Sequence, residues 1–240
     1  MAHRLVRTAM IMTAAAACAG ACGGGGADGA KTQQVKSTGR AALAGTAYTS
    51  AQLQQALLAQ PAGYKRVGEV DAGEYGALKA VQNFEQLHRQ VTLDKPDCAG
   101  AAGGTPGGKA LDKTAPAAIA TYGKSSGQTI TETLMSMPAE AAEQHVKAKV
   151  PAACGTFKTK VGGKWSEHRV VESPSAAIGD GSRTVGISTR SGASRVKTWY
   201  VVVQGRRYLA TVSLIGPNVT RAEAEQIARQ ADAQARRVLP

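Results

Sequence analysis

A series of short apolar-rich runs between residues 156 and 215 constrains the fold more than any other feature of this sequence. The runs cover 156–161, 164–172, 184–190, 195–204 and 207–215. Gly162-Gly163 separates the first two runs, and a glycine pair tolerates the positive φ angles of tight hairpin turns. Gly205-Arg206 separates the last two runs. Strands joined by such short turns pair antiparallel. The first two runs therefore predict a hairpin, and the last three predict an antiparallel meander with Val201-Val202-Val203 in its most buried strand.

Helical apolar spacing predicts that helices accompany this meander at the start, in the middle and at the end of the domain. The expected helices run from Thr49 or Ser50 to Pro61, from Tyr75 to Val91, from Pro138 to Pro151 and from Thr220 to Val238. A short strand over 64–70, a hairpin over 119–123 and 129–137, and a loop over 98–118 complete the expectation. The predicted class is α+β: a single domain with an antiparallel meander packed against N-terminal, middle and C-terminal helices.

The first residues have the pattern of an export signal. Arg4 and Arg7 form a positively charged start, and the largely apolar stretch over 5–17 contains no carboxylate and is too short to span a bilayer. Ala19-Gly20-Ala21 then precedes Cys22, which resembles the lipobox that bacteria cleave and lipidate at its cysteine. We expect residues 1–21 to be a lipoprotein signal peptide and Cys22 to be lipidated. Lipidation at Cys18 and simple cleavage with secretion remain the alternatives.

The segment from Cys22 to Ala47 consists mostly of Gly, Ala, Lys, Thr, Gln and Ser. Such a segment cannot bury enough apolar surface to offset its ordering entropy, so we expect a flexible stalk over 22–47. Residues 48–240 are left as one domain, which is within the usual size of a single domain.

Two cysteines remain after the signal, Cys98 and Cys154, and an even pair in an oxidising compartment predicts a disulfide. Neither cysteine has CxxC spacing, and the three histidines beyond the signal, His88, His145 and His168, are far from them in sequence. This pattern does not indicate a zinc site, and the sequence predicts no cofactor.

The chain has 29 Lys and Arg against 17 Asp and Glu, a formal charge of +12. Only 4% of the residues are aromatic, and no reading helix or aromatic-lined basic face is recognisable, so nucleic acid is not an expected partner. Anionic envelope polymers and lipid head groups are the candidate partners of the basic surface. A solvated surface without a partner is the alternative.

The sequence lacks a nucleophile elbow of the α/β-hydrolase type. Ser125, Ser126, Ser136 and Ser166 each lack a lysine three residues later. We therefore expect no enzyme activity. An envelope hydrolase whose catalytic groups meet only in space stays open.

The order of elements resembles the PknH-like extracytoplasmic sensor domain of actinobacterial receptor kinases and their free-standing lipoprotein forms. The matching segments span about residues 48–239: Thr49 to Leu58 with Pro61 to Tyr64, Pro96 to Ala99, Ala141 to Phe157, Gly179-Asp180, and Arg206 to Val212 with the final helix. The resemblance implies an α+β domain with a ligand cleft between sheet and helices and no catalytic residues. The sensor domain of these kinases has two disulfides, whereas this chain has cysteines for one. No kinase or transmembrane helix is attached here, so we do not expect a direct signalling role.

These observations lead to two function hypotheses. The first is a lipid-anchored, non-enzymatic binding domain for an unidentified small-molecule or envelope ligand. Its candidate cleft residues are Trp165, Trp199, Tyr200, Arg206, Arg207 and Tyr208. The alternative is a structural lipoprotein that docks onto a partner or an anionic polymer through its basic surface and has no small-molecule site.

Overall fold

The computed structural model describes residues 47–102, 110–174 and 176–240. Ten strands form one sheet in the order β1-β4-β5-β10-β9-β8-β7-β6-β3, with β2 paired to β4. The strands are β1 (Lys65–Arg66), β2 (Asp71–Glu74), β3 (Thr92–Leu93), β4 (Pro116–Gly123), β5 (Thr129–Ser136), β6 (Thr156–Val161), β7 (Lys164–Ser173), β8 (Gly181–Ser191), β9 (Ser194–Gln204) and β10 (Tyr208–Gly216). The α-helices are α1 (Ser50–Ala56), α2 (Lys79–His88), α3 (Ala99–Ala102), α4 (Ala139–Lys147) and α5 (Arg221–Val238). Three 3₁₀ turns, η1 (Tyr75–Ala77), η2 (Pro96–Cys98) and η3 (Ala152–Cys154), join them. All the strand pairings are antiparallel, so the predicted α+β class is confirmed.

The three predicted meander strands are β8, β9 and β10, which are neighbours in the sheet, and the hairpin of β6 and β7 continues the sheet beside β8. Gly162 and Gly163 turn between β6 and β7 with φ angles of 54° and 82°, which a residue with a Cβ rarely adopts. Strand β10 then pairs with β5 on its other side, and this joins the early hairpin β4–β5 to the meander.

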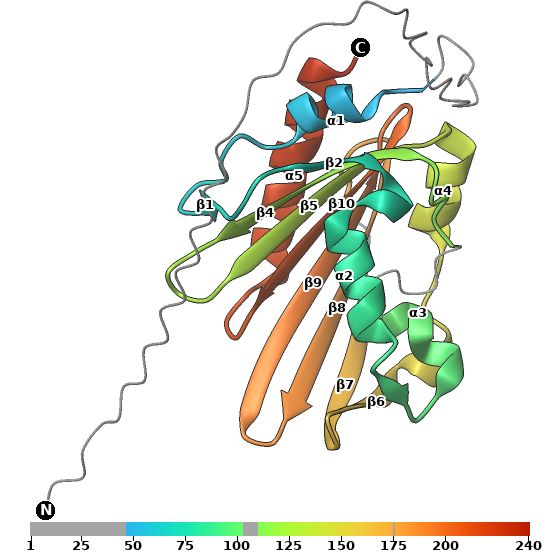
Figure 1. The fold of residues 1–240 in the computed structure, drawn as a ribbon, viewed down its shortest axis with the longest axis vertical. Coiled ribbons are helices and arrows are strands. Elements are labelled where there is room, and N and C mark those ends of the chain that lie inside the picture. The colour runs from blue at the N-terminus through green and yellow to red at the C-terminus, as the bar shows by residue number, and fades with distance from the viewer. Residues whose placement is uncertain (1–46, 103–109, 175) are drawn as a thin grey trace, which may run out of the picture. The chain divides into compact units, whose positions relative to one another are not determined.

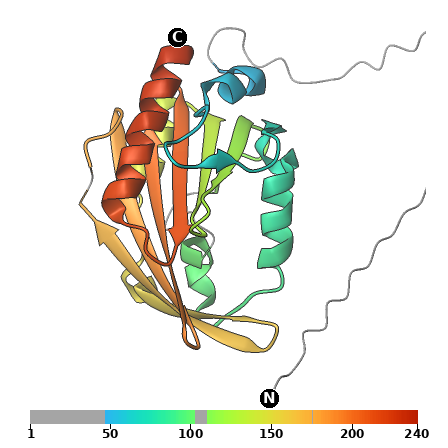
Figure 2. The same ribbon diagram turned by 90° about the vertical axis from the view of Figure 1, so that its left-hand side faces the viewer.

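Helices α1 and α5 cover one face of the sheet, and α2 and α4 lie against the other (Figures 1 and 2). The largest cluster of buried side chains lies under α1 and α5 and includes Tyr122, Leu134, Val201 and Leu214. A smaller cluster under α2 and α4 includes Met135 and Leu209. Neighbouring residues of a strand point to opposite faces, which is why Leu134 and Met135 belong to different clusters.

A buried carboxylate ties the segment after α1 to the sheet. Glu132 in β5 is fully buried, and its Oε2 accepts a hydrogen bond of 2.9 Å from the Leu58 N–H. The hydroxyl of Tyr122 donates to the Leu58 carbonyl and lies 3.4 Å from the same Oε2. Burial raises the pKa of Glu132 to about 7, because the charged form loses hydration that these bonds replace only in part.

Polar contacts also fix α5 on the sheet. Thr220 caps the helix by accepting from the Glu223 N–H, as the sequence predicts. Farther along, the Tyr208 hydroxyl donates to Asp232 at 2.7 Å, and Asp232 also accepts from Arg236 at 2.9 Å. The buried Tyr208 hydroxyl and Asp232 carboxylate are therefore satisfied by hydrogen bonds.

The predicted disulfide is confirmed: Cys98 and Cys154 are bonded, with their Cα atoms 5.4 Å apart. The bond joins η2 and η3, which otherwise share few contacts with the sheet. The ring of Phe157 packs beside it in a small third cluster of buried residues. This cluster holds the far edge of the sheet to the segment that follows α2.

The predicted signal peptide over 1–21, the lipidation sites Cys22 and Cys18, and nearly all of the stalk over 22–47 lie outside the described residues and stay predictions. Within the described ranges, no helix has the length and apolar character needed to cross a bilayer.

Candidate functional site

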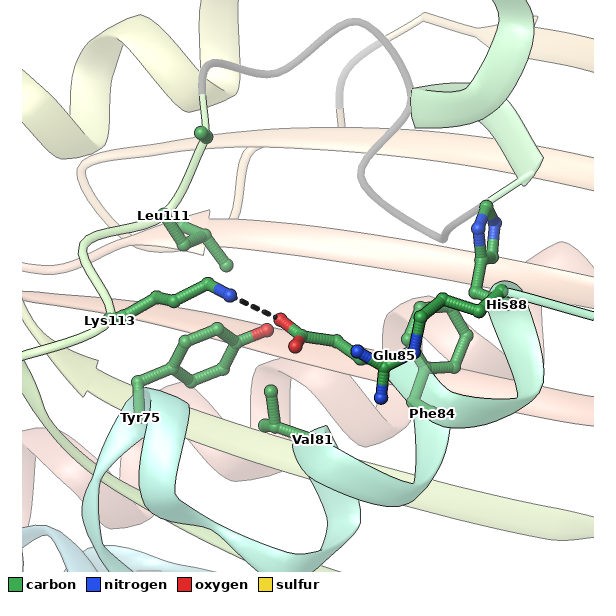
Figure 3. Close-up of a pocket in the computed structure, with 9 residues that line it drawn as sticks. Tyr75, Val81, Phe84, Glu85, His88, Leu111 and Lys113 are labelled. Atoms are coloured by element: carbon green, nitrogen blue, oxygen red, sulfur yellow. Dashed lines mark ion pairs between the residues drawn. The ribbon is translucent and has the colours of Figure 1, made fainter. Parts of the chain in front are cut away.

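A pocket of about 480 Å³ lies between α2 and the segment that precedes β4 (Figure 3). Its lining residues are Tyr75, Val81, Phe84, Glu85, His88, Arg89, Ala110, Leu111 and Lys113. A volume of this size is within the range of small-molecule sites. Because it combines apolar and charged walls, we take it as the candidate site.

One stripe of α2 forms the wall of this pocket. Val81, Phe84, Glu85 and His88 follow the helical spacing of three and four residues, so their side chains lie on one face of the helix. The rings of Phe84 and His88 are 5.5 Å apart between centroids. This stripe gives the pocket an apolar wall with one carboxylate and one imidazole.

The opposite wall is fixed by backbone bonds to η1. The Gly76 N–H donates to the Lys113 carbonyl at 2.8 Å, and the Tyr75 N–H donates to the Ala115 carbonyl at 2.9 Å. A Cβ on Gly76 would lie 2.8 Å from the Lys113 side chain, so glycine is required for this close approach. The segment is thereby held within reach of α2.

An ion pair joins the two walls at the rim. Lys113 Nζ lies 2.8 Å from Glu85 Oε1, and the Tyr75 hydroxyl points toward the same carboxylate in Figure 3. The hydrogen bond from Lys113 holds the pKa of Glu85 below its usual value. Burial, followed by the charge of Glu85, raises the pKa of Tyr75. Tyr75 thus stays protonated and serves as a hydrogen-bond donor or acceptor.

Among the described residues that line it, the pocket shows binding groups and no catalytic pair. His88 Nε2 is buried and makes no hydrogen bond within the described residues, so no group orients it as a base. The described residues contain no cluster of three His, Cys, Asp or Glu that could hold a metal ion. An apolar floor under Tyr75, Glu85, Lys113 and Arg89 suits an amphipathic ligand with a polar or charged head.

A second histidine, His168 in β7, has a structural role. His168 lies between the hydroxyls of Thr159 and Thr189, at 2.8 and 2.9 Å, and its ring stacks on Phe157 with centroids 4.7 Å apart. Burial lowers the pKa of His168, so the neutral ring is favoured. Both ring nitrogens are held by threonine hydroxyls, so the ring joins three neighbouring strands.

The six cleft residues predicted from the sequence do not line one cavity. Trp199 and Tyr200 are consecutive in β9 and point to opposite faces of the sheet. The ring of Trp199 lies over Gly186, where a Cβ would be 2.7 Å away. Trp165 is exposed at the turn end of β7.

The remaining three predicted residues lie at the other end of the sheet. Tyr208 is buried against α5 through its bond to Asp232, and Arg206 is exposed in the β9–β10 turn. Arg207 lies over the ring of Tyr48, 4.8 Å from its centroid, and donates to the Pro240 carbonyl. A ligand contact by any of the six stays a prediction.

Sequence reasoning missed the pocket beside α2. The apolar stripe on this helix was a visible signal, but such stripes are usually core. Glu85 and Lys113 are separated by a loop, and no sequence pattern pairs them.

Comparisons with known proteins give one informative likeness. No family model matches the chain. No curated protein matches it. The extracellular domain of PknH from Mycobacterium tuberculosis aligns with a TM-score of 0.54 and 16% identity, over 80% of this chain and 98% of that chain. An uncharacterized protein from Mycobacterium smegmatis aligns with a TM-score of 0.39 and 18% identity, over 61% and 76%, a likeness too weak to support an argument. The predicted resemblance is therefore confirmed at the level of the fold.

Proposed function

We propose that this chain is a cell-envelope lipoprotein, anchored at Cys22, whose domain binds an extracytoplasmic ligand in the pocket beside α2 and does not convert it chemically. The pocket carries the proposal, because it combines an apolar wall with an ion pair at the rim. The fold of an extracellular domain and the export pattern of residues 1–21 support the location. A sensor-like role in the envelope follows from the same likeness.

The test is native mass spectrometry of residues 47–240. All three clusters of buried side chains lie within this range, and the PknH domain of similar extent was crystallised by itself. The protein is incubated with a lipid and metabolite extract of the host envelope, separated from unbound material, and weighed before and after denaturation. We expect a bound mass that denaturation releases unchanged.

A matched pair of variants localises the binding. Ala110 is exposed at the pocket, so Ala110→Trp fills the opening without disturbing the core, and Ala222→Trp places the same ring on the exposed face of α5. We expect the first variant to lose the bound mass and the second to keep it. A bare wild-type chain, or a mass retained by Ala110→Trp, would contradict the proposal. A released molecule with a changed mass would indicate an enzyme.

One observation favours the alternative, docking through a basic surface. Six cations of β6, β7, β8 and β9 lie close together without carboxylate partners among the described residues. Docking on a soluble polyanion should weaken steeply with salt, whereas binding in the pocket should change little.

A further inference from the structure

Two hairpin turns lie side by side at the end of the sheet farthest from α1 and the C-terminus (Figure 1). One joins β6 to β7 and the other joins β8 to β9, and the pairing of Glu167 with Arg190 places them next to each other. A hollow of about 330 Å³ between them is lined by Trp165 and Glu167 from one hairpin and by Arg190 and Gly192 from the other. We call residues 158–167 and 188–197 the tip surface.

Large apolar side chains are exposed on the tip surface. Val161, Trp165 and Val196 have 52%, 47% and 37% of their surface exposed. The first two flank the Gly162-Gly163 turn, and Val196 is near the start of β9. The strand register puts Trp165 on one face of the sheet and Val161 and Val196 on the other, so apolar side chains are exposed on both faces of the tip surface.

Positive charge gathers around these apolar side chains. The tip surface holds six cations, Lys158, Lys160, Lys164, Arg190, Arg195 and Lys197, and one carboxylate, Glu167. Residues 47–240 as a whole hold 24 Lys or Arg and 16 Asp or Glu, so the excess charge is concentrated here. All six cations are exposed, and none forms an ion pair with another described residue.

The combination of the two features identifies the partner. A soluble polyanion would use the cations and leave the apolar turns in water. An anionic bilayer uses both, because aromatic and aliphatic side chains enter the interface while Lys and Arg stay at the head groups. Lys160 Nζ lies 5.8 Å from the centre of the Trp165 ring, so the ammonium can remain at head-group level above an inserted indole.

We propose that the tip surface docks peripherally on an anionic lipid bilayer, with Val161, Trp165 and Val196 at the interface and the cations on the head groups. This inference goes beyond the ligand pocket and does not rest on it. It also requires no lipid anchor, since each cation near an anionic membrane contributes binding by itself.

Vesicle sedimentation tests the proposal with residues 47–240, which carry no lipid. Vesicles of phosphatidylcholine containing roughly a third phosphatidylglycerol are compared with vesicles of phosphatidylcholine alone. We expect binding to the anionic vesicles at low salt, at least tenfold weaker binding to the neutral ones, and release as the salt concentration rises. Equal binding to both vesicles, or to neither, would overturn the proposal.

Matched variants separate the tip surface from the rest of the domain. Lys164→Ser with Arg195→Ser should weaken anionic-vesicle binding by about fivefold per cation removed. Lys65→Ser with Lys79→Ser removes the same charge from exposed sites at the other end and should change it less than twofold. Trp165→Ser should weaken binding by at least fivefold, while Leu87→Ser, at a residue 63% exposed on α2, should not. Equal effects of tip and control variants would contradict docking through the tips.

Fluorescence and a soluble competitor complete the test. The chain has two tryptophans, and Trp199 is packed against the core, so it serves as an internal reference for Trp165. Brominated lipid should quench the emission of Trp165, which is the part of the signal that Trp165→Phe lacks. The emission of Trp199, which that variant keeps, should not change. Polyglutamate binding as strong as vesicle binding, and unchanged in Trp165→Ser, would instead assign the surface to an anionic polymer.

Discussion

The inner strands β4, β5 and β10 and the outer strands β6 and β7 differ in what covers them. Each inner strand is buried by helices, and β10 alternates core residues on one face with partly exposed residues on the other. In β7, by contrast, every residue is at least partly exposed. Hydrogen-bonded strand pairing is continuous across both regions, so pairing does not distinguish them. The two regions differ because α1, α2, α4 and α5 bury the inner strands.

Because of this difference, the inner strands provide the stability of the domain and the outer strands provide surface for contacts with other molecules. Apolar side chains removed from water stabilise the inner strands by about 25 cal/mol per Å². The outer strands have little such burial, and a disulfide holds their edge to the chain instead. The exposed faces that result, and the pocket beside α2, are free to meet ligand or membrane.

The largest effect is expected from a cavity in the inner strands. Leu134→Ala should lower the free energy of unfolding by about 4 kcal/mol, because Leu134 is fully buried among residues of β4, β10 and α1 that cannot collapse onto the space. Urea denaturation followed by circular dichroism measures it. A loss below about 1 kcal/mol would mean that the inner strands do not carry the stability.

Removal of the disulfide should be nearly as destabilising, but its effect should begin in the outer strands. The bond closes a loop of sequence separation 56, for which loop-closure entropy gives at most about 4 kcal/mol. In Cys98→Ser with Cys154→Ser we expect hydrogen exchange to rise first in β6 and α3. A uniform rise across β4, β5 and β10 would contradict the separation of the two regions.

The buried Glu132 gives the inner strands a pH dependence. Its pKa is raised to about 7 in the folded protein, so the folded state keeps a proton that the unfolded chain releases. This contribution to stability is complete below about pH 4.5 and is lost as the pH rises to about 7, a change of about 3 kcal/mol. Glu132→Gln should abolish that part of the pH profile, measured as the difference from wild type. Parallel profiles would show that Glu132 titrates normally.

The smallest effect is expected on the outer strands. Val171 in β7 is 47% exposed, so Val171→Ala should change the free energy of unfolding by less than about 0.5 kcal/mol. The same denaturation assay as for Leu134→Ala makes the two values comparable. A loss close to that of Leu134→Ala would remove the contrast.

Local patterns in the sequence were sufficient to predict most elements. The β6–β7 hairpin appears within one residue of its expected bounds, because Gly162-Gly163 marks its turn, and Thr220 begins α5 as expected. The Cys98–Cys154 bond followed from the number of cysteines. Strand β2, with the sequence Asp-Ala-Gly-Glu, was not predicted, because its strand state comes from pairing with β4 and not from its own residues.

Relations between distant segments were not predictable in the same way. No sequence pattern pairs β5 with β10 or Glu85 with Lys113, since both contacts arise from tertiary packing. The burial of Glu132 was predictable from the sequence, because Glu132 shares a strand face with Ile130 and Leu134. The grouping of Trp199 with Tyr200 overlooked the alternation of side chains along a strand.

Hydrogen–deuterium exchange of residues 47–240 tests most directly the claim that contacts lie outside the inner strands. The protein is measured alone, with host envelope extract and with anionic vesicles. We predict slower exchange over 75–89 and 110–113 with extract, slower exchange over 158–167 and 188–197 with vesicles, and no change in β5 or β10. If extract or vesicles slowed exchange only in β5, β10 or α5, the claim that contacts lie outside the inner strands would be contradicted.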